Sequence, residues 1–142
     1  MVTAPRLPDG RPFPTTYYLT CQRATKAVST LEGSGLMAEM TGWLATDPDL
    51  AERYRQAHGA YLADRAELGR RLGLDVPEIA GQSAGGMPDR VKCLHALIAH
   101  SLAKGPGVNP LGDQGLDRLG DFWATPCRDT ATPRRPADQE AS

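Results

Sequence analysis

The sequence predicts an α+β fold that is predominantly helical, with about five helices and a small extended or β element at the N-terminus. Apolar residues recur at helical spacing through most of the chain, turns rich in proline and glycine separate these repeats, and only Thr15–Thr20 has the composition of a strand. A chain of 142 residues, 40% of them hydrophobic, is long enough to bury one core. We expect one globular domain over residues 1–124 and a disordered tail over residues 125–142.

The first 14 residues contain four prolines and the turn Pro8–Gly10, so they cannot form a helix and are expected to form an extended arm. Thr15–Thr20 is β-branched and aromatic, which is typical of a short strand. A strand needs a partner, and the arm is the only candidate in this chain.

Two short helices are expected next. The first has a helical apolar repeat and ends at glycines that favour a left-handed conformation. Its repeat is Ala24, Ala27, Val28 and Leu31, followed by Gly33 and Gly35. The second carries the stripe Leu36, Met40, Trp43 and Leu44.

The longest helix is predicted to begin at Asp47 and Pro48 and to end near Gly73. An aspartate N-cap followed by proline in the first turn is a strong start signal. Its inward residues are expected to be Leu50, Tyr54, Ala57, Tyr61, Leu68 and Leu72. Its mostly outward residues are expected to be Arg53, Arg55, Asp64, Arg65, Glu67 and Arg70.

A central helix is predicted from an Asp89 cap to about Lys104, stopping at Gly105. It is apolar nearly all round, which indicates packing on both sides. One stripe holds Val91, Leu94, His95, Ile98 and Leu102, and the opposite side holds Cys93, Ala96, Leu97 and His100. Asp113 is expected to cap a last helix with apolar residues Leu116, Leu119, Phe122 and Trp123.

Composition excludes several classes of function. The net charge of −1 gives no overall attraction to nucleic acid, and no apolar run approaches the roughly 18 residues of a membrane span. The N-terminus lacks the apolar region of a secretory signal, so we expect a cytoplasmic protein. Three cysteines without a CxxC pair predict reduced thiols rather than a disulfide framework.

A metal site is the first candidate chemistry, with zinc or iron as the ion. The ligand types present are Cys21, Cys93, His95, His100 and Cys127. On one regular helix Cys93 and His100 lie roughly 10 Å apart along the axis, and His95 falls on the other face unless Cys93 lies in a distorted first turn. Tertiary folding would have to gather these ligands, and buried thiols and core histidines are the simpler interpretation.

The turn before the central helix is a second candidate, because free N–H groups and cationic side chains there could meet an anion. It comprises Gly85, Gly86, Asp89 and Arg90. It matches neither the Walker pattern nor GxGxxG, and a capping Asp89 would occupy the anion position, which favours capping over ligand binding. Asn109 and Asp113, in the turn after the helix, complete the candidate residues.

A thiol enzyme would need a histidine within reach of Cys93 or Cys21, and Cys93 and His95 point apart on a regular helix. An adaptor role would use the arginine-rich long helix, together with aromatic residues that a small core cannot all bury. Those aromatic residues are Trp43, Phe122 and Trp123. We therefore expect a non-enzymatic accessory or interaction protein, with a possible protein partner, and a metal-dependent or thiol enzyme as the alternative.

Four segments resemble the actinobacterial family called domain of unknown function 501. They are FPTTYYLTC from Phe13, SGLMAEMT from Ser34, AHGAY from Ala57 and SAGGMPDRVKCLHALIAHSLAKGPGVNPLGD from Ser83. The resemblance covers about Pro5 to Asp113 and implies no established activity. It associates the protein with genes for enolase, a septum-formation initiator and an exopolyphosphatase, and so with cell division or polyphosphate metabolism.

Family members usually begin further upstream, with an Arg-Cys-Pro-like turn and a short apolar run. This chain begins inside that segment, at Met1. The resemblance therefore implies a shortened member or a misassigned start. Either would remove a strand partner for Thr15–Thr20 and a cysteine ligand.

Overall fold

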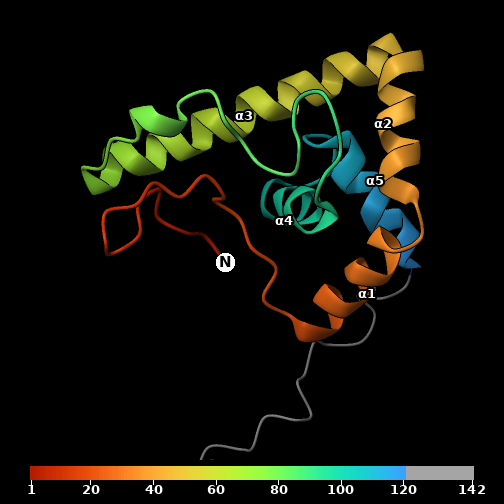
Figure 1. Cartoon of the computed structure of the whole chain (residues 1–142), viewed down its shortest axis with the longest axis horizontal. Coiled ribbons are helices and arrows are strands. Elements are labelled where there is room, and N and C mark those ends of the chain that lie inside the picture. The colour runs from red at the N-terminus through yellow and green to blue at the C-terminus, as the bar shows by residue number, and fades with distance from the viewer. Residues whose placement is uncertain (121–142) are drawn as a thin grey trace, which may run out of the picture.

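The computed structural model describes residues 1–120, in which five α-helices follow an extended N-terminal arm (Figure 1). The helices are α1 (Gln22–Glu32), α2 (Leu36–Thr46), α3 (Pro48–Leu72), α4 (Leu94–Lys104) and α5 (Pro110–Leu119), with a 3-10 turn at Pro77–Ile79. The predicted helical character is therefore confirmed. The predicted disordered tail, Phe122 and Trp123 lie outside the described residues. No helix within residues 1–120 combines the length and apolar character that crossing a membrane requires.

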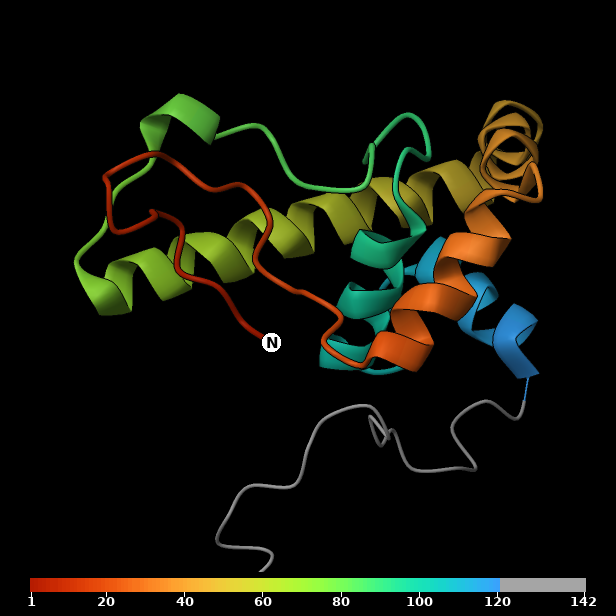
Figure 2. The same ribbon diagram turned by 60° about the horizontal axis from the view of Figure 1, so that its bottom comes forward.

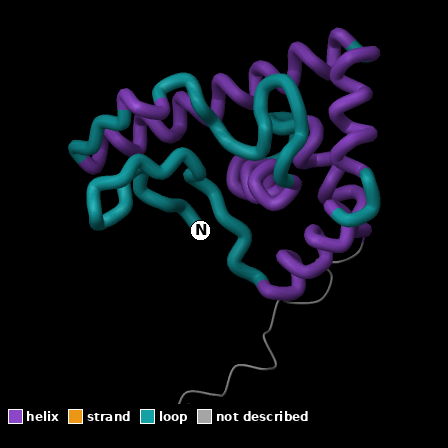
Figure 3. Tube along the Cα trace, in the orientation of Figure 1, coloured by secondary structure: helices purple, strands orange, loops and turns teal. Residues whose placement is uncertain are grey.

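The predicted N-terminal β element is wrong. In the part of the chain that the structure describes, the arm forms only isolated antiparallel bridges, Val2 to Tyr17 and Arg6 to Pro12, and Figure 3 shows it as loop. Two backbone donors that a strand would use, the N–H groups of Thr16 and Tyr17, instead donate to the Tyr61 hydroxyl oxygen, at 2.6 and 3.3 Å. The arm is thus fixed by side chains of α3 rather than by a sheet.

α3 begins and ends as predicted. The Asp47 carboxylate accepts a hydrogen bond from the Leu50 N–H at 3.0 Å, and Gly73 closes the helix in the left-handed region at φ 67°. Two side-chain predictions on this helix are wrong. Leu72 is 52% exposed, because it lies in the last turn, whereas Arg65 is buried.

Arg65 is buried because the arm and the 3-10 turn both supply carbonyl groups to it. Its guanidinium donates to the Pro14 carbonyl oxygen at 2.8 Å and to the Ile79 carbonyl oxygen at 2.7 Å. A buried arginine is tolerated where its donors are satisfied in this way. The outward arginines of α3 instead pair with acids on the same helix, as Arg55 does with Glu52 at 2.8 Å.

α4 occupies the centre of the molecule, which confirms the prediction of a helix packed on both sides. Figures 1 and 2 show it enclosed by α3, α1, α5 and the arm. Leu94 and the run from Ala96 to Ser101 are buried, while Leu102 is 47% exposed.

The predicted start of α4 at Asp89 is wrong, because tertiary hydrogen bonds hold residues 89–93 in a turn. The Gly85 carbonyl oxygen accepts the Lys92 N–H at 2.7 Å. From α3 the Tyr54 hydroxyl donates to the Arg90 carbonyl oxygen, and from α2 the Thr41 hydroxyl oxygen accepts the Val91 N–H. These bonds occupy backbone groups that a helix would need, so α4 begins only at Leu94.

The cap of α5 is also different from the prediction. Asn109, not Asp113, is the N-cap, and its side-chain oxygen accepts the Gly112 N–H at 3.0 Å. Pro110 then occupies the first turn, a pattern that was visible in the sequence. Asp113 accepts the Gly107 N–H at 2.9 Å and so closes the turn between the two helices.

Gly33, expected to be left-handed, ends α1 in the right-handed region at φ −72°.

α5 approaches α4 so closely that two of its residues must be glycine. A Cβ at Gly112 would overlap the Leu97 carbonyl oxygen and the Ser101 hydroxyl oxygen, and a Cβ at Gly115 would lie 2.9 Å from two Ile98 side-chain atoms. The first overlap includes a backbone atom that cannot rotate away. This contact therefore determines how near the last helix comes to the central one.

We predict that Gly112→Ala lowers the free energy of unfolding by about 3 kcal/mol, because the added methyl group must push two helices apart. Gly59→Ala is the matched control, since Gly59 lies exposed within α3 and its Cβ would meet nothing within 4 Å. That change should instead stabilise the protein by roughly 0.5–1 kcal/mol through helix propensity. Urea unfolding followed by circular dichroism measures both, and equal effects would contradict the close packing.

Candidate metal centre

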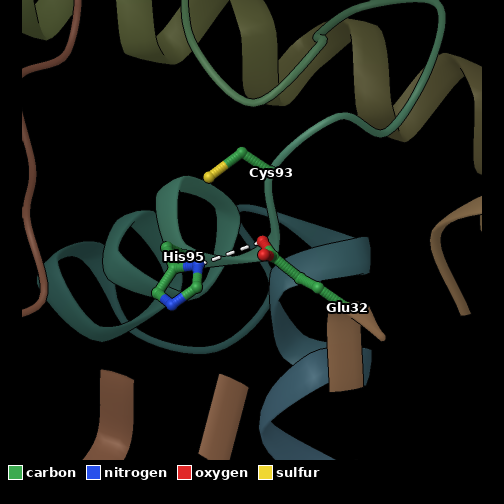
Figure 4. Close-up of side chains that lie close together, drawn as sticks. All are labelled: Glu32, Cys93 and His95. Atoms are coloured by element: carbon green, nitrogen blue, oxygen red, sulfur yellow. Dashed lines mark hydrogen bonds and ion pairs between the residues drawn. The ribbon is translucent and has the colours of Figure 1, made fainter. Parts of the chain in front are cut away.

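Three side chains capable of binding a metal converge where the end of α1 meets the start of α4. Glu32 is the last residue of α1, Cys93 is the N-cap residue of α4, and His95 lies in the first turn of α4. One ligand atom from each residue lies within 4.8 Å of the other two. Figure 4 shows the three side chains close together, with a dashed line between the His95 ring and the Glu32 carboxylate.

Cys93 and His95 can share a site because Cys93 is not helical. Its backbone is extended, at φ −150° and ψ 107°, so the angular separation of residues i and i+2 on a regular helix does not apply. The sequence had left this possibility open in the form of a distorted first turn. The late start of α4 at Leu94 therefore makes the cluster geometrically possible.

Glu32 joins the two helices through one carboxylate oxygen. Its Oε1 atom accepts the Leu94 N–H at 2.8 Å and lies 3.0 Å from His95 Nδ1. Cys93 makes no side-chain cap, so Glu32 provides the capping acceptor for α4 from another helix. A carboxylate at this end also interacts favourably with the helix dipole.

The second ring nitrogen of His95 indicates which tautomer is present. His95 Nε2 lies 3.0 Å from the Thr25 carbonyl oxygen, which can only accept, and 3.3 Å from the Ser29 hydroxyl oxygen. The Ser29 hydroxyl already donates to Thr25 at 2.9 Å, so Nε2 must carry a proton. The Nδ1 atom then directs its lone pair at the Glu32 carboxylate, unless a proton or a metal ion lies between Nδ1 and the carboxylate oxygen.

Burial raises the pKa of the Cys93 thiol above its usual range, and the negative charge of Glu32 adds to this effect. The backbone N–H groups of Ala96 and His95 act in the opposite direction, but burial is the largest cause. Cys93 is a free, half-buried thiol. Without a metal it is therefore protonated at neutral pH, which disfavours direct nucleophilic chemistry.

The other predicted ligands are not part of this cluster. His100 is fully buried further along α4, where its ring stacks on Tyr17 with ring centroids 5.8 Å apart. Cys21 is the N-cap residue of α1 and is disulfide-bonded, so the prediction of a reduced thiol is wrong for Cys21 and correct for Cys93. Cys127 lies outside the described residues.

Asn109 orients His100 in the core. The Asn109 oxygen is occupied by the Gly112 N–H, so its amide nitrogen donates to His100 Nδ1 at 3.1 Å. His100 Nε2 then carries the proton and is buried without a partner among residues 1–120. Burial lowers the pKa of His100 to about 4, so the ring is neutral at neutral pH.

The candidate anion turn forms one wall of a groove rather than the start of a helix. A Cβ at Gly85 would lie 2.7 Å from a Leu97 side-chain atom, and one at Gly86 would lie 2.7 Å from the Arg90 carbonyl oxygen, so tight packing explains both glycines. Asp89 does not cap α4. The objection that a capping carboxylate fills the anion position therefore no longer applies.

Sequence reasoning missed Glu32, which is far from Cys93 in the sequence because α2 and α3 lie between them. No local spacing could identify it, because glutamate at a helix end is common and usually solvated. It also missed the Thr25 carbonyl group, since backbone acceptors have no sequence signal. The CxH spacing of Cys93 and His95 was the one local sign of this site.

Comparison with known proteins identifies the family. The family model described as "Protein of unknown function (DUF501)" matches residues 1–117 of the 142-residue chain, so the chain belongs to that family. This match confirms the resemblance seen in the four sequence segments. Neither the curated proteins nor the solved structures provide a match.

The depressed pKa of His100 predicts a loss of stability in mild acid. Below the ordinary histidine pKa of about 6.5, His100 binds a proton in the unfolded chain. In the folded chain it does not bind this proton until the pH falls to about 4. The contribution of this ring to the free energy of unfolding should therefore be fully present above pH 6.5. It should fall by up to about 3 kcal/mol between pH 6.5 and 4.

Urea unfolding from pH 7.5 to 4.5 measures this slope. His100→Phe keeps an aromatic ring but cannot titrate, so its stability should change less over this range than that of the unaltered protein. His58→Gln is the control, because His58 is a half-buried histidine on α3. An identical slope in the unaltered protein and His100→Phe would show that another group is responsible.

Proposed function

We propose that this protein binds a divalent transition-metal ion, zinc in the first instance, through Glu32, Cys93 and His95. The observation that carries the proposal is the protonation pattern of His95. Its Nε2–H group donates to the Thr25 carbonyl oxygen, and its Nδ1 atom faces the Glu32 carboxylate. Metal-bound histidines usually donate their other ring N–H to such an acceptor, which orients the ring toward the ion.

The donor set suits zinc or ferrous iron. Zinc accepts thiolate sulfur, imidazole nitrogen and carboxylate oxygen at about 2.0–2.3 Å, which separates neighbouring ligands by roughly 3.3–3.8 Å. The three ligand atoms lie within 4.8 Å of one another, so movements of about an ångström would complete the arrangement. Metal binding would displace the Cys93 proton, in spite of the raised pKa of the free thiol.

Within residues 1–120 the cluster offers three protein ligands, which leaves a fourth position for water or another molecule. Structural zinc sites usually have four protein ligands, whereas three ligands with an open position are typical of catalytic sites. This count favours a metal-dependent reaction over a purely structural ion, and so revises the order of the two functions expected from sequence. A nucleophilic thiol enzyme fits less well, because burial keeps Cys93 protonated.

An adaptor role through the arginine-rich face of α3 has less support. Arg53, Arg55, Arg70 and Arg71 each form an ion pair with an acid of the same helix. Such a face offers little unpaired charge to an acidic partner. A cytoplasmic location and a role in cell division or polyphosphate metabolism stay predictions from the sequence and its family resemblance.

Zinc affinity tests the proposal. Protein purified with a reductant should bind one zinc ion, as measured by elemental analysis and by competition with a chromophoric chelator. Glu32→Gln, Cys93→Ser and His95→Gln should each weaken binding at least tenfold, because each removes one of three ligands. Glu39→Gln and His58→Gln are matched controls outside the cluster and should bind zinc normally.

The competing interpretation is a simple ion pair between Glu32 and a protonated His95. Under that interpretation Glu32→Gln and His95→Gln would lower stability without any zinc effect, and Cys93→Ser would change neither. Absence of stoichiometric zinc binding by the reduced, folded protein would overturn the proposed function.

A further inference from the structure

The groove beside Cys93 has a cationic lining that the metal site alone does not explain. It encloses about 780 Å³ between the arm at Pro14 and Thr15 and the loop that precedes α4. Cys93 belongs both to the lining of this groove and to the candidate metal cluster. Cys93 is the one member of the cluster that also lines the groove, so the groove and the candidate metal site meet at this residue.

The groove lining is cationic, and its cations are unpaired within the described residues. Arg90 and Lys92 are exposed on the lining and form no ion pair within residues 1–120, and Asp89 is the single acid among the lining residues. By contrast, the outward arginines of α3 are neutralised by neighbouring acids. Positive charge without an ion-pair partner in residues 1–120 is thus present on the lining of the groove that Cys93 shares.

Gly85 and Gly86 also line this groove. The N–H groups of Gly85 and Gly86 have no acceptor among residues 1–120. Ser83 also lines the groove, but it is already engaged by His58 at 2.7 Å. Amide groups of this kind in a glycine-rich turn, together with arginine and lysine, are the donors that recognise oxyanions.

We propose that the groove binds a small phosphate-bearing ligand whose phosphoryl oxygen takes the open position of the metal ion held by Glu32, Cys93 and His95. This inference rests on the proposed metal site and names the class of molecule that it acts on. A phosphate carries about 1.5–2 negative charges and three oxygens, so it can contact Arg90 and Lys92 and still offer an oxygen to the ion. A carboxylate has only two oxygens and one charge.

Cobalt(II) provides a probe, because its visible spectrum reports both thiolate ligation and a change of ligand at the open position. Cobalt-loaded protein should develop a sulfur-to-metal absorption that Cys93→Ser removes. Adding inorganic phosphate should then shift the visible bands, and acetate at the same concentration should shift them less.

The double variant Arg90→Gln/Lys92→Gln should bind cobalt with unchanged affinity and need about tenfold more phosphate for the same shift. Arg53→Gln/Arg118→Gln removes two exposed cations elsewhere and should behave as the unaltered protein does. Circular dichroism confirms that each variant is folded.

The outcomes separate the two proposals. If folded, reduced protein binds neither cobalt nor zinc, the metal proposal fails and this one fails with it. If cobalt binds but phosphate leaves its spectrum unchanged, or acetate shifts the bands as strongly, only the phosphate inference is overturned. An equal phosphate response in Arg90→Gln/Lys92→Gln would overturn the assignment to this groove.

Discussion

The close approach of α5 to α4 at Gly112 is the constraint on which the rest of this small fold depends. It allows α4 to be covered on one side by backbone rather than by bulky side chains, while α1, α3 and the arm cover the others. Asn109, which caps α5 at the same contact, also orients the buried ring of His100. Packing of the central helix and the protonation state of its core histidine are therefore coupled.

A helix buried in this way cannot rely on solvent to satisfy the N–H groups of its first turn. Glu32 solves that problem for α4 by accepting the Leu94 N–H from the end of α1. The same oxygen lies beside His95, so the Leu94 N–H group and the proposed ion would share one carboxylate. A carboxylate has enough lone pairs to serve both.

The loop between Gly85 and Cys93 links this junction to the groove. Its hydrogen bonds to Tyr54 and Thr41 hold it out of the helix, and this same distortion turns the Cys93 side chain toward His95. Arg90 and Lys92 lie exposed on the loop, beside the cluster. One local departure from helical geometry therefore accounts for the approach of Cys93 to His95 and for the position of Arg90 and Lys92, which form no ion pair within residues 1–120.

The sequence by itself determined the number of helices, both ends of α3 and the burial of α4, because N-cap, proline and glycine signals and apolar periodicity act over a few residues. Only the tertiary structure decided that Arg65 turns inward, that α4 begins at Leu94 and that Glu32 joins Cys93 and His95. Each of these depends on a hydrogen-bond partner supplied by a segment distant in the chain. Such partners outweigh local preference, since a buried polar group left unsatisfied costs about 1–3 kcal/mol.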